Sequence, residues 1–157
     1  MVIDSFSGKY RFLSNFFPAD VVLDGEHYPT VEHAYQAAKT TDPMERKVIQ
    51  IMQTPGLARS AGRSKVVIRH LRTNWESIKV AVMLGLLHQK FANPIMRSAL
   101  RATGNATLIE GNTWGDKFWG QVSGEGDNML GILLMMVRSE LPIIETPYFP
   151  DADERPF

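Results

Sequence analysis

The sequence predicts a helix-rich α+β domain with a small β component. Several segments carry apolar residues at helical spacing, whereas only a few short segments are typical of strands. The strands do not alternate regularly with the helices, so a doubly wound sheet of the Rossmann type is not expected. The 157 residues contain no internal repeat and no linker, and this length is typical of one domain.

The β component is predicted at the start of the chain. Residues 2–6 have the composition of a short strand, and an aromatic, irregular segment follows. Residues 20–29 are predicted to form a β-hairpin, because Asp24 and Gly25 make a favoured two-residue turn.

Three helices are then expected in succession. Thr30 is a suitable N-cap for a helix that runs to about Lys39. Proline is tolerated in a first helical turn, which predicts a second helix over residues 43–53. Residues 54–62 are expected to form a short third helix that ends at Gly62.

The second half continues with helices around one more strand. Asn74 is expected to cap a long helix that runs to about Phe91, and a further helix over 94–104 ends at Gly104. Residues 106–111 are predicted to form a strand.

The last helix is predicted over residues 128–141, with Asp127 as its cap. It is apolar on nearly every side, so we expect it to lie centrally in the core. We therefore assign residues 1–141 to the domain. Residues 142–157 form a proline-rich, acidic tail.

Composition excludes several classes of function. The chain has 17 basic and 17 acidic residues, so no overall charge directs it to nucleic acid or to an anionic membrane. It has no cysteine, which rules out disulfides and thiolate chemistry. The N-terminal residues do not resemble a signal peptide, and no apolar run is long enough to span a bilayer. The cytoplasm is the expected compartment.

A polar stripe on the first predicted helix is the main candidate for chemistry. Glu32, Gln36 and Lys39 stand at positions i, i+4 and i+7, and Tyr35 borders them. This stripe is either a solvated helix face or one wall of a pocket that holds a carboxylate and an amine. In a pocket, the carboxylate can activate water or stabilise positive charge on a sugar, and the amine can form a Schiff base.

Two loops place aromatic and polar side chains together. Asn15 and Phe16 can contact the edge and the face of a base, or they can serve the fold. In the segment over 112–128, Trp114 and Trp119 can form a slot for a flat heterocycle, with Asp116 reaching the sugar, or they can be hydrophobic plugs.

Phosphate and metal signals are weaker. The guanidinium of Arg63 can bind phosphate oxygens, although a surface charge is the commoner role. Asn128, in the first turn of the last helix, can reach a ligand hydroxyl. His27 and His33 do not have the spacing of a metal pair, and we expect neither a metal nor a cofactor.

Six segments in this order together resemble one family: FLSNF, YPTVEHAYQAAK, AGR, NWE, WGDKFWG and GDNMLGILLMMVR. The chain resembles the YbiA-like family, also called NADAR for its association with NAD and ADP-ribose metabolism. The resemblance covers about residues 12–138. It implies a compact, helix-rich α+β domain with N-glycosidase activity on ribosylated pyrimidine intermediates of riboflavin biosynthesis or on ADP-ribosylated guanine in nucleic acid.

The resemblance also implies site residues. Glu32 and Lys39 match a glutamate and a lysine of the family's helical motif, and further family positions are Asn15, Trp119, Gly120 and Asn128. Together with the pattern-based candidates, the expected catalytic residues are Glu32, Lys39 and Asp116. The expected substrate-binding residues are Asn15, Phe16, Tyr35, Gln36, Arg63, Trp114, Trp119, Gly120 and Asn128.

The expected partner is a nucleotide-like small molecule or ADP-ribosylated nucleic acid, and the sequence does not choose between them. It gives no oligomeric state. Two other classes stay open: a module that binds ADP-ribose or a nucleotide without cleaving it, and a structural partner protein without a ligand.

Overall fold

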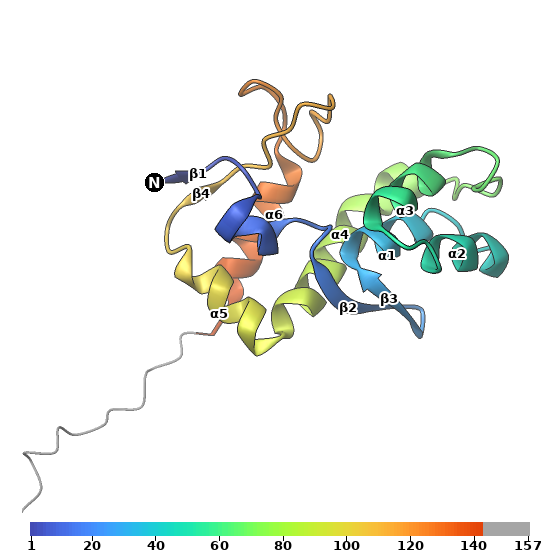
Figure 1. Cartoon of the computed structure of the whole chain (residues 1–157), viewed down its shortest axis with the longest axis horizontal. Helices are drawn as coiled ribbons and strands as arrows, with labels where there is room; N and C mark the ends of the chain where they lie inside the picture. Colours follow the sequence, from blue (N-terminus) through green and yellow to red (C-terminus); the bar gives the residue numbers. More distant parts are fainter. Residues whose placement is uncertain (143–157) are drawn as a thin grey trace, which may run out of the picture.

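The computed structural model describes residues 1–142 and confirms the α+β fold (Figure 1). All of the predicted tail except its first residue lies outside the described residues. The elements follow in the order β1 (Val2–Ile3), η1 (Gly8–Leu13), β2 (Pro18–Leu23), β3 (Glu26–Thr30), α1 (Val31–Ala37), α2 (Pro43–Gln50), α3 (Pro55–Arg63), α4 (Trp75–Ala92), α5 (Pro94–Ala102), β4 (Thr107–Leu108) and α6 (Met129–Glu140).

The β component consists of two small sheets. The hairpin of β2 and β3 is antiparallel, as predicted, and its turn residues Asp24 and Gly25 have φ angles of 49° and 85°. Two positive φ angles match the right-handed twist of the flanking strands, which explains the choice of residues. The strands predicted at 2–6 and 106–111 shorten to the two-residue parallel pair of β1 and β4.

Side-chain caps begin four of the helices among residues 1–142. Thr30 Oγ1 accepts from the backbone N–H of His33 at the start of α1, and Asp42, Thr54 and Asn93 cap α2, α3 and α5 in the same way. The final helix differs from the prediction. Asn128, in a left-handed conformation, takes the N-cap position expected for Asp127, and its side chain makes no cap hydrogen bond.

Helix α1 lies at the centre of one half of the molecule. It packs against α2, α3, α4 and both strands of the hairpin, while α4 connects this half to α5 and α6 (Figure 1). All seven residues of α1 are buried. The alternative of a solvated helix face is therefore wrong for α1. The prediction that α6 lies centrally in the core is correct for one face, where Leu130, Leu134 and Val137 are buried, but wrong for the other, where Ile132 and Met136 are exposed.

None of the helices among residues 1–142 is long and apolar enough to cross a membrane.

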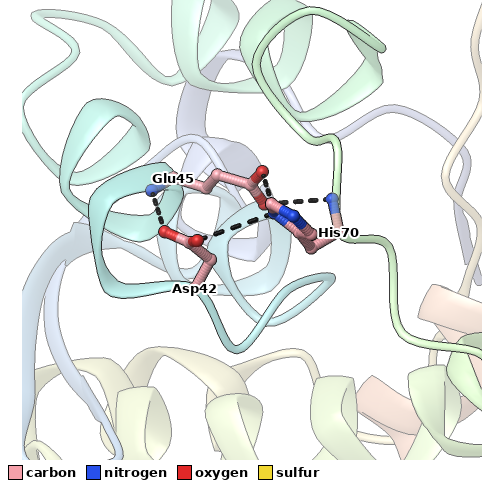
Figure 2. Close-up of side chains that lie close together, drawn as sticks. All are labelled: Asp42, Glu45 and His70. Atoms are coloured by element: carbon pink, nitrogen blue, oxygen red, sulfur yellow. Dashed lines mark hydrogen bonds and ion pairs between the residues drawn. The ribbon is translucent and has the colours of Figure 1, made fainter.

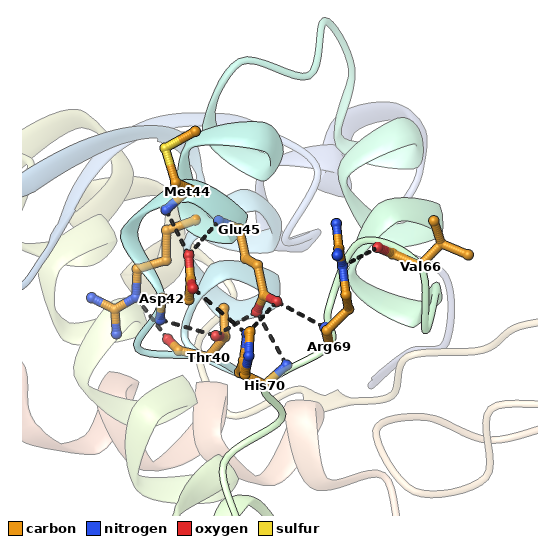
Figure 3. Close-up of polar contacts among 8 residues, drawn as sticks. Thr40, Asp42, Met44, Glu45, Val66, Arg69 and His70 are labelled. Atoms are coloured by element: carbon orange, nitrogen blue, oxygen red, sulfur yellow. Dashed lines mark hydrogen bonds and ion pairs between the residues drawn. The ribbon is translucent and has the colours of Figure 1, made fainter.

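A buried carboxylate anchors the segment that connects α3 to α4. The carboxyl group of Glu45 accepts hydrogen bonds from the Thr40 hydroxyl and from the backbone N–H groups of Arg69 and His70, and it pairs with the His70 ring at 2.8 Å (Figures 2 and 3). Asp42 lies beside it and caps α2. Because protein donors occupy the Glu45 oxygens, this cluster has a structural role.

Glu45→Gln is expected to lower the free energy of unfolding by about 2 kcal/mol at about pH 7, since it leaves buried donors without a charged acceptor. Burial raises the pKa of Glu45, but the hydrogen bonds outweigh it and hold the pKa at about 2. The folded state thus binds this proton more weakly than the unfolded state, so the stabilisation is lost as pH falls from about 4.5 toward 2. In denaturant unfolding, the free energy of unfolding of the wild type should exceed that of Glu45→Gln near pH 7, and the difference should be much smaller near pH 3. A difference independent of pH would contradict this role.

Candidate active site

A cavity of about 320 Å³ opens beside α1 and collects residues from five parts of the chain. They come from the segment before β2, from α1 and the residues just after it, from α3, from α4 and from the loop after β4. Of the twelve predicted site residues, ten line this cavity: Asn15, Phe16, Glu32, Tyr35, Gln36, Lys39, Arg63, Trp114, Asp116 and Trp119. Its volume is in the range of small-molecule sites.

The polar stripe, made of Glu32 and Gln36 on α1 and Lys39 two residues beyond its end, lines the cavity. The Glu32 and Gln36 side chains are joined by a hydrogen bond of 2.8 Å from Gln36 Nε2 to Glu32 Oε1, and the two residues are only 7% and 3% exposed. The backbone N–H of Glu32 donates to the carbonyl of Asn15, which fixes the start of α1 against the neighbouring loop. A buried carboxylate so close to a cavity is a strong candidate for function.

Burial shifts both ionisable groups of the stripe. Burial raises the pKa of Glu32, and the hydrogen bond from Gln36 with the nearby cations Arg59, Lys39 and Arg63 only partly opposes it. Burial lowers the pKa of Lys39 to about 8, against the attraction of Glu32. The Lys39 ammonium donates to the carbonyl of Gly62 at 3.1 Å. A lysine with this pKa is partly neutral near physiological pH, as a nucleophilic amine must be.

Aromatic rings form one wall and the mouth. Trp119 Nε1 donates to the Tyr35 hydroxyl at 3.2 Å, and the two rings meet edge to face with centroids 5.4 Å apart. Trp119 is thereby held rigidly. Trp114 and Phe16 are 56% and 37% exposed, and the Arg59 guanidinium lies 5.3 Å and 6.0 Å from their ring centroids. Exposed rings at a cavity mouth can stack on a flat ligand.

Asp116 organises the loop that carries both tryptophans. Its Oδ1 accepts from the backbone N–H groups of Phe118 and Trp119, at 3.1 Å and 2.9 Å. Its Oδ2 lies 3.8 Å from Arg59. One oxygen thus shapes the loop, and the other faces a cation of the cavity.

Two predicted site residues, Gly120 and Asn128, are not among the residues that line the cavity. Asn128 donates to the Leu108 carbonyl and accepts from the backbone N–H of Glu110, so both ends of its amide are used within the protein. A side chain at Gly120 would place its Cβ 2.2 Å from the Glu110 carbonyl oxygen. Both residues contact the backbone at Glu110, and their direct contact with a ligand stays a prediction.

Four residues that line the cavity were not predicted as site residues: Ser14, Arg59, Met83 and Glu110. Arg59 stands four residues before Arg63 on the same helix, so helical spacing would have found it. Met83 lies in the middle of an apolar helix, where nothing marks it. Glu110 follows a two-residue strand, and only the fold brings it to the cavity.

The two histidines considered for metal binding have other partners. His33 is buried, with Nδ1 2.7 Å from the Thr30 hydroxyl and Nε2 donating to the Met52 carbonyl at 2.9 Å. His27 pairs with Asp20 on the exposed face of the hairpin.

Fold and site together define a helix-rich α+β protein whose buried carboxylate and lysine share one pocket. A family model described as the NADAR domain matches residues 4–142, and the chain belongs to this family. It is 40% identical to the N-glycosidase YbiA of Escherichia coli (strain K12) over 141 residues, which cover 88% of this chain and 86% of that protein.

A solved structure and a plant protein are also similar to this chain. The NMR structure of Escherichia coli YbiA matches with a TM-score of 0.77 and 36% identity, covering 97% of this chain and 90% of that one. The riboflavin biosynthesis protein PYRR of Zea mays is 37% identical over 143 residues, which cover 82% of this chain and 23% of that longer protein.

Proposed function

We propose that this protein is an N-glycosidase that hydrolyses the C1′–N bond of a ribose phosphate or ADP-ribose conjugate. The observation that carries the proposal is the cavity that joins Glu32 and Lys39 to two arginines and a pair of tryptophans. Relatives that the chain matches over most of its length are named N-glycosidases, which supports the same activity.

The cavity can hold the three parts of such a substrate. Arg59 and Arg63, one helical turn apart on α3, are suited to phosphate oxygens. Trp114 at the mouth and Trp119 on the wall are suited to the flat base. The ribose then lies over the stripe of α1, where Glu32 faces its C1′ carbon.

Positive charge builds on C1′ and the ring oxygen as the base leaves, and the Glu32 carboxylate stabilises it. The bond from C1′ to the base breaks, its electron pair leaves with the base nitrogen, and Lys39 Nζ bonds to C1′. One proton of the resulting secondary ammonium is lost to solvent, and the other moves to the ring oxygen as the C1′–O4′ bond breaks, which gives an imine. Water then hydrolyses the imine, with Glu32 as its base, to the free sugar aldehyde and Lys39. The scheme uses no cofactor and no metal.

Borohydride added during turnover is expected to reduce this imine and to increase the mass of the peptide that contains Lys39 by one reduced sugar phosphate. Lys39→Met keeps an unbranched side chain but removes the amine and should give no adduct, whereas Lys47→Met, at an exposed lysine of α2, should still give it. Release of base by the wild type without any adduct would assign the attack to water and remove Lys39 as nucleophile.

The substrate is either a ribosylaminopyrimidine phosphate or ADP-ribosylated guanine in nucleic acid, and both present the same C1′–N bond. Incubation with each compound, followed by chromatography of the released base, tests the activity. Tight binding of both without release would favour a module that only binds nucleotides. Because these phosphorylated compounds are charged and stay inside the cell, we place the reaction in the cytoplasm.

A further inference from the structure

Glu110 stands on a firmly held backbone segment of the cavity. Its N–H donates to Asn128 Oδ1 at 3.0 Å, and its carbonyl accepts from the N–H of Gln121 at 2.8 Å. Gly120 packs so closely that any side chain there would collide with the Glu110 carbonyl. The fold therefore fixes this residue at the cavity wall from three sides, although the scheme above gives it no task.

The carboxyl group of Glu110 faces the cavity without a protein partner. Among residues 1–142, no hydrogen bond or ion pair involves its side chain, in contrast to Glu32, which is bonded to Gln36. A group placed on a rigid backbone and left free at a cavity is available to a ligand.

The charges around the two glutamates differ in sign. Burial, together with the carboxylates of Asp116 and Glu32, raises the pKa of Glu110 to about 7, and Arg59 opposes this shift. Burial raises the pKa of Glu32 as well, but its charged neighbours are the cations Arg59, Lys39 and Arg63, which favour its ionised form. The charged neighbours therefore favour the protonated form at Glu110 and the ionised form at Glu32, as in a pair made of an acid and its ionised partner.

We propose that Glu110 is the general acid of the reaction and delivers its proton to the departing base. The inference rests on the proposed function and adds the protonation of the leaving base, to which the scheme above assigns no residue. As the C1′–N bond breaks, the electron pair moves to the base nitrogen, and the Glu110 proton bonds to that pair, so the base departs neutral. Glu110 is left as a carboxylate and regains a proton from solvent before the next turnover.

In this scheme, the backbone contacts of Gly120 and Asn128 position Glu110. They are positioning residues that hold Glu110 at the cavity that Glu32 also lines, so that the acid and the stabilising carboxylate are fixed at one site.

The test compares the pH dependence of kcat/KM for wild type, Glu110→Gln and Glu125→Gln on whichever substrate the wild type cleaves. The reaction needs Glu110 protonated and Lys39 neutral, with pKa values of about 7 and about 8, so the wild-type profile has a maximum between them and falls on the alkaline side. Glu110→Gln should be slower by about 100-fold and should lack the alkaline fall. Glu125→Gln, an exposed carboxylate paired with Lys117, should match the wild type.

A ribosylpyridinium phosphate gives a second readout, because its pyridine leaves neutral without receiving a proton. Relative to wild type, Glu110→Gln should lose much less activity on this compound than on an amine-linked base. An unchanged affinity for ribose 5-phosphate in Glu110→Gln shows that the variant is folded.

The inference is overturned if folded Glu110→Gln retains the wild-type rate on the amine-linked substrate, or if it keeps the alkaline fall. A wild-type protein that releases no base from any substrate would instead refute the proposed function, so the two failures are distinguishable.

Discussion

Glu32→Gln is expected to lower kcat/KM by about 1,000-fold, or about 4 kcal/mol of transition-state stabilisation. The amide keeps the size of the side chain and still accepts the hydrogen bond from Gln36, but it carries no charge to balance the sugar cation. The measurement is base release under conditions of low substrate concentration. Glu26→Gln, at an exposed carboxylate of the hairpin, is the control and should retain full activity.

The stability of Glu32→Gln should not fall together with its activity. Because burial raises the pKa of Glu32, the folded state binds its proton more tightly than the unfolded state, and wild-type stability falls as pH rises above about 4.5. Glu32→Gln removes this cost and should unfold at the same or a higher denaturant concentration near pH 7. Loss of activity together with loss of stability would reduce Glu32 to a structural residue.

Gly62→Ala is expected to cost about 3 kcal/mol of folding free energy and to impair the site as well. A Cβ at this position would lie 2.7 Å from Gln36 Cβ and closer still to Gln36 Oε1. Helices α1 and α3 must then separate, which pulls Gln36 from Glu32 and moves the carbonyl that binds Lys39. Thermal unfolding and base release should both report the change.

Gly56 supplies a matched control in the same helix. A Cβ there would meet only Thr54 Oγ1, at 3.9 Å. Gly56→Ala should therefore leave activity unchanged and stabilise the protein by about 0.5–1 kcal/mol, because alanine is the better helix former. Equal effects at the two glycines would show that helix propensity, and not the contact between α1 and α3, governs Gly62.

The sequence predicts those parts of the fold that local chemistry determines. The hairpin turn at Asp24 and the cap at Thr30 depend on a few neighbouring residues, and both are confirmed. The ends of the last helix and its exposed face are not determined locally. Asn128 holds Leu108 and Glu110, twenty and eighteen residues away, and this tertiary task displaces the cap expected at Asp127.

The site residues also differ in whether local sequence predicts them. Glu32 and Gln36 share α1, and Lys39 follows two residues after its end, so their spacing shows that they lie together, but it cannot show that the whole helix is buried by its neighbours. Glu110 reaches the cavity through the pairing of β1 with β4 and the contacts of the following loop. No short segment encodes that arrangement, which is why this carboxylate emerges only from the structure.

The central claim is that the cavity hydrolyses a C1′–N bond, and one measurement tests it directly. The wild-type protein and Glu32→Gln are each incubated in oxygen-18 water with ribosylaminopyrimidine phosphate and, separately, with an oligonucleotide that carries ADP-ribosylated guanine. Mass spectrometry then follows the released base and the sugar. We predict that the wild type releases the base from one of the two substrates, with oxygen-18 at C1′ of the sugar, and that Glu32→Gln releases about 1,000-fold less. Binding of both substrates without release, or equal release by the variant, would contradict the claim.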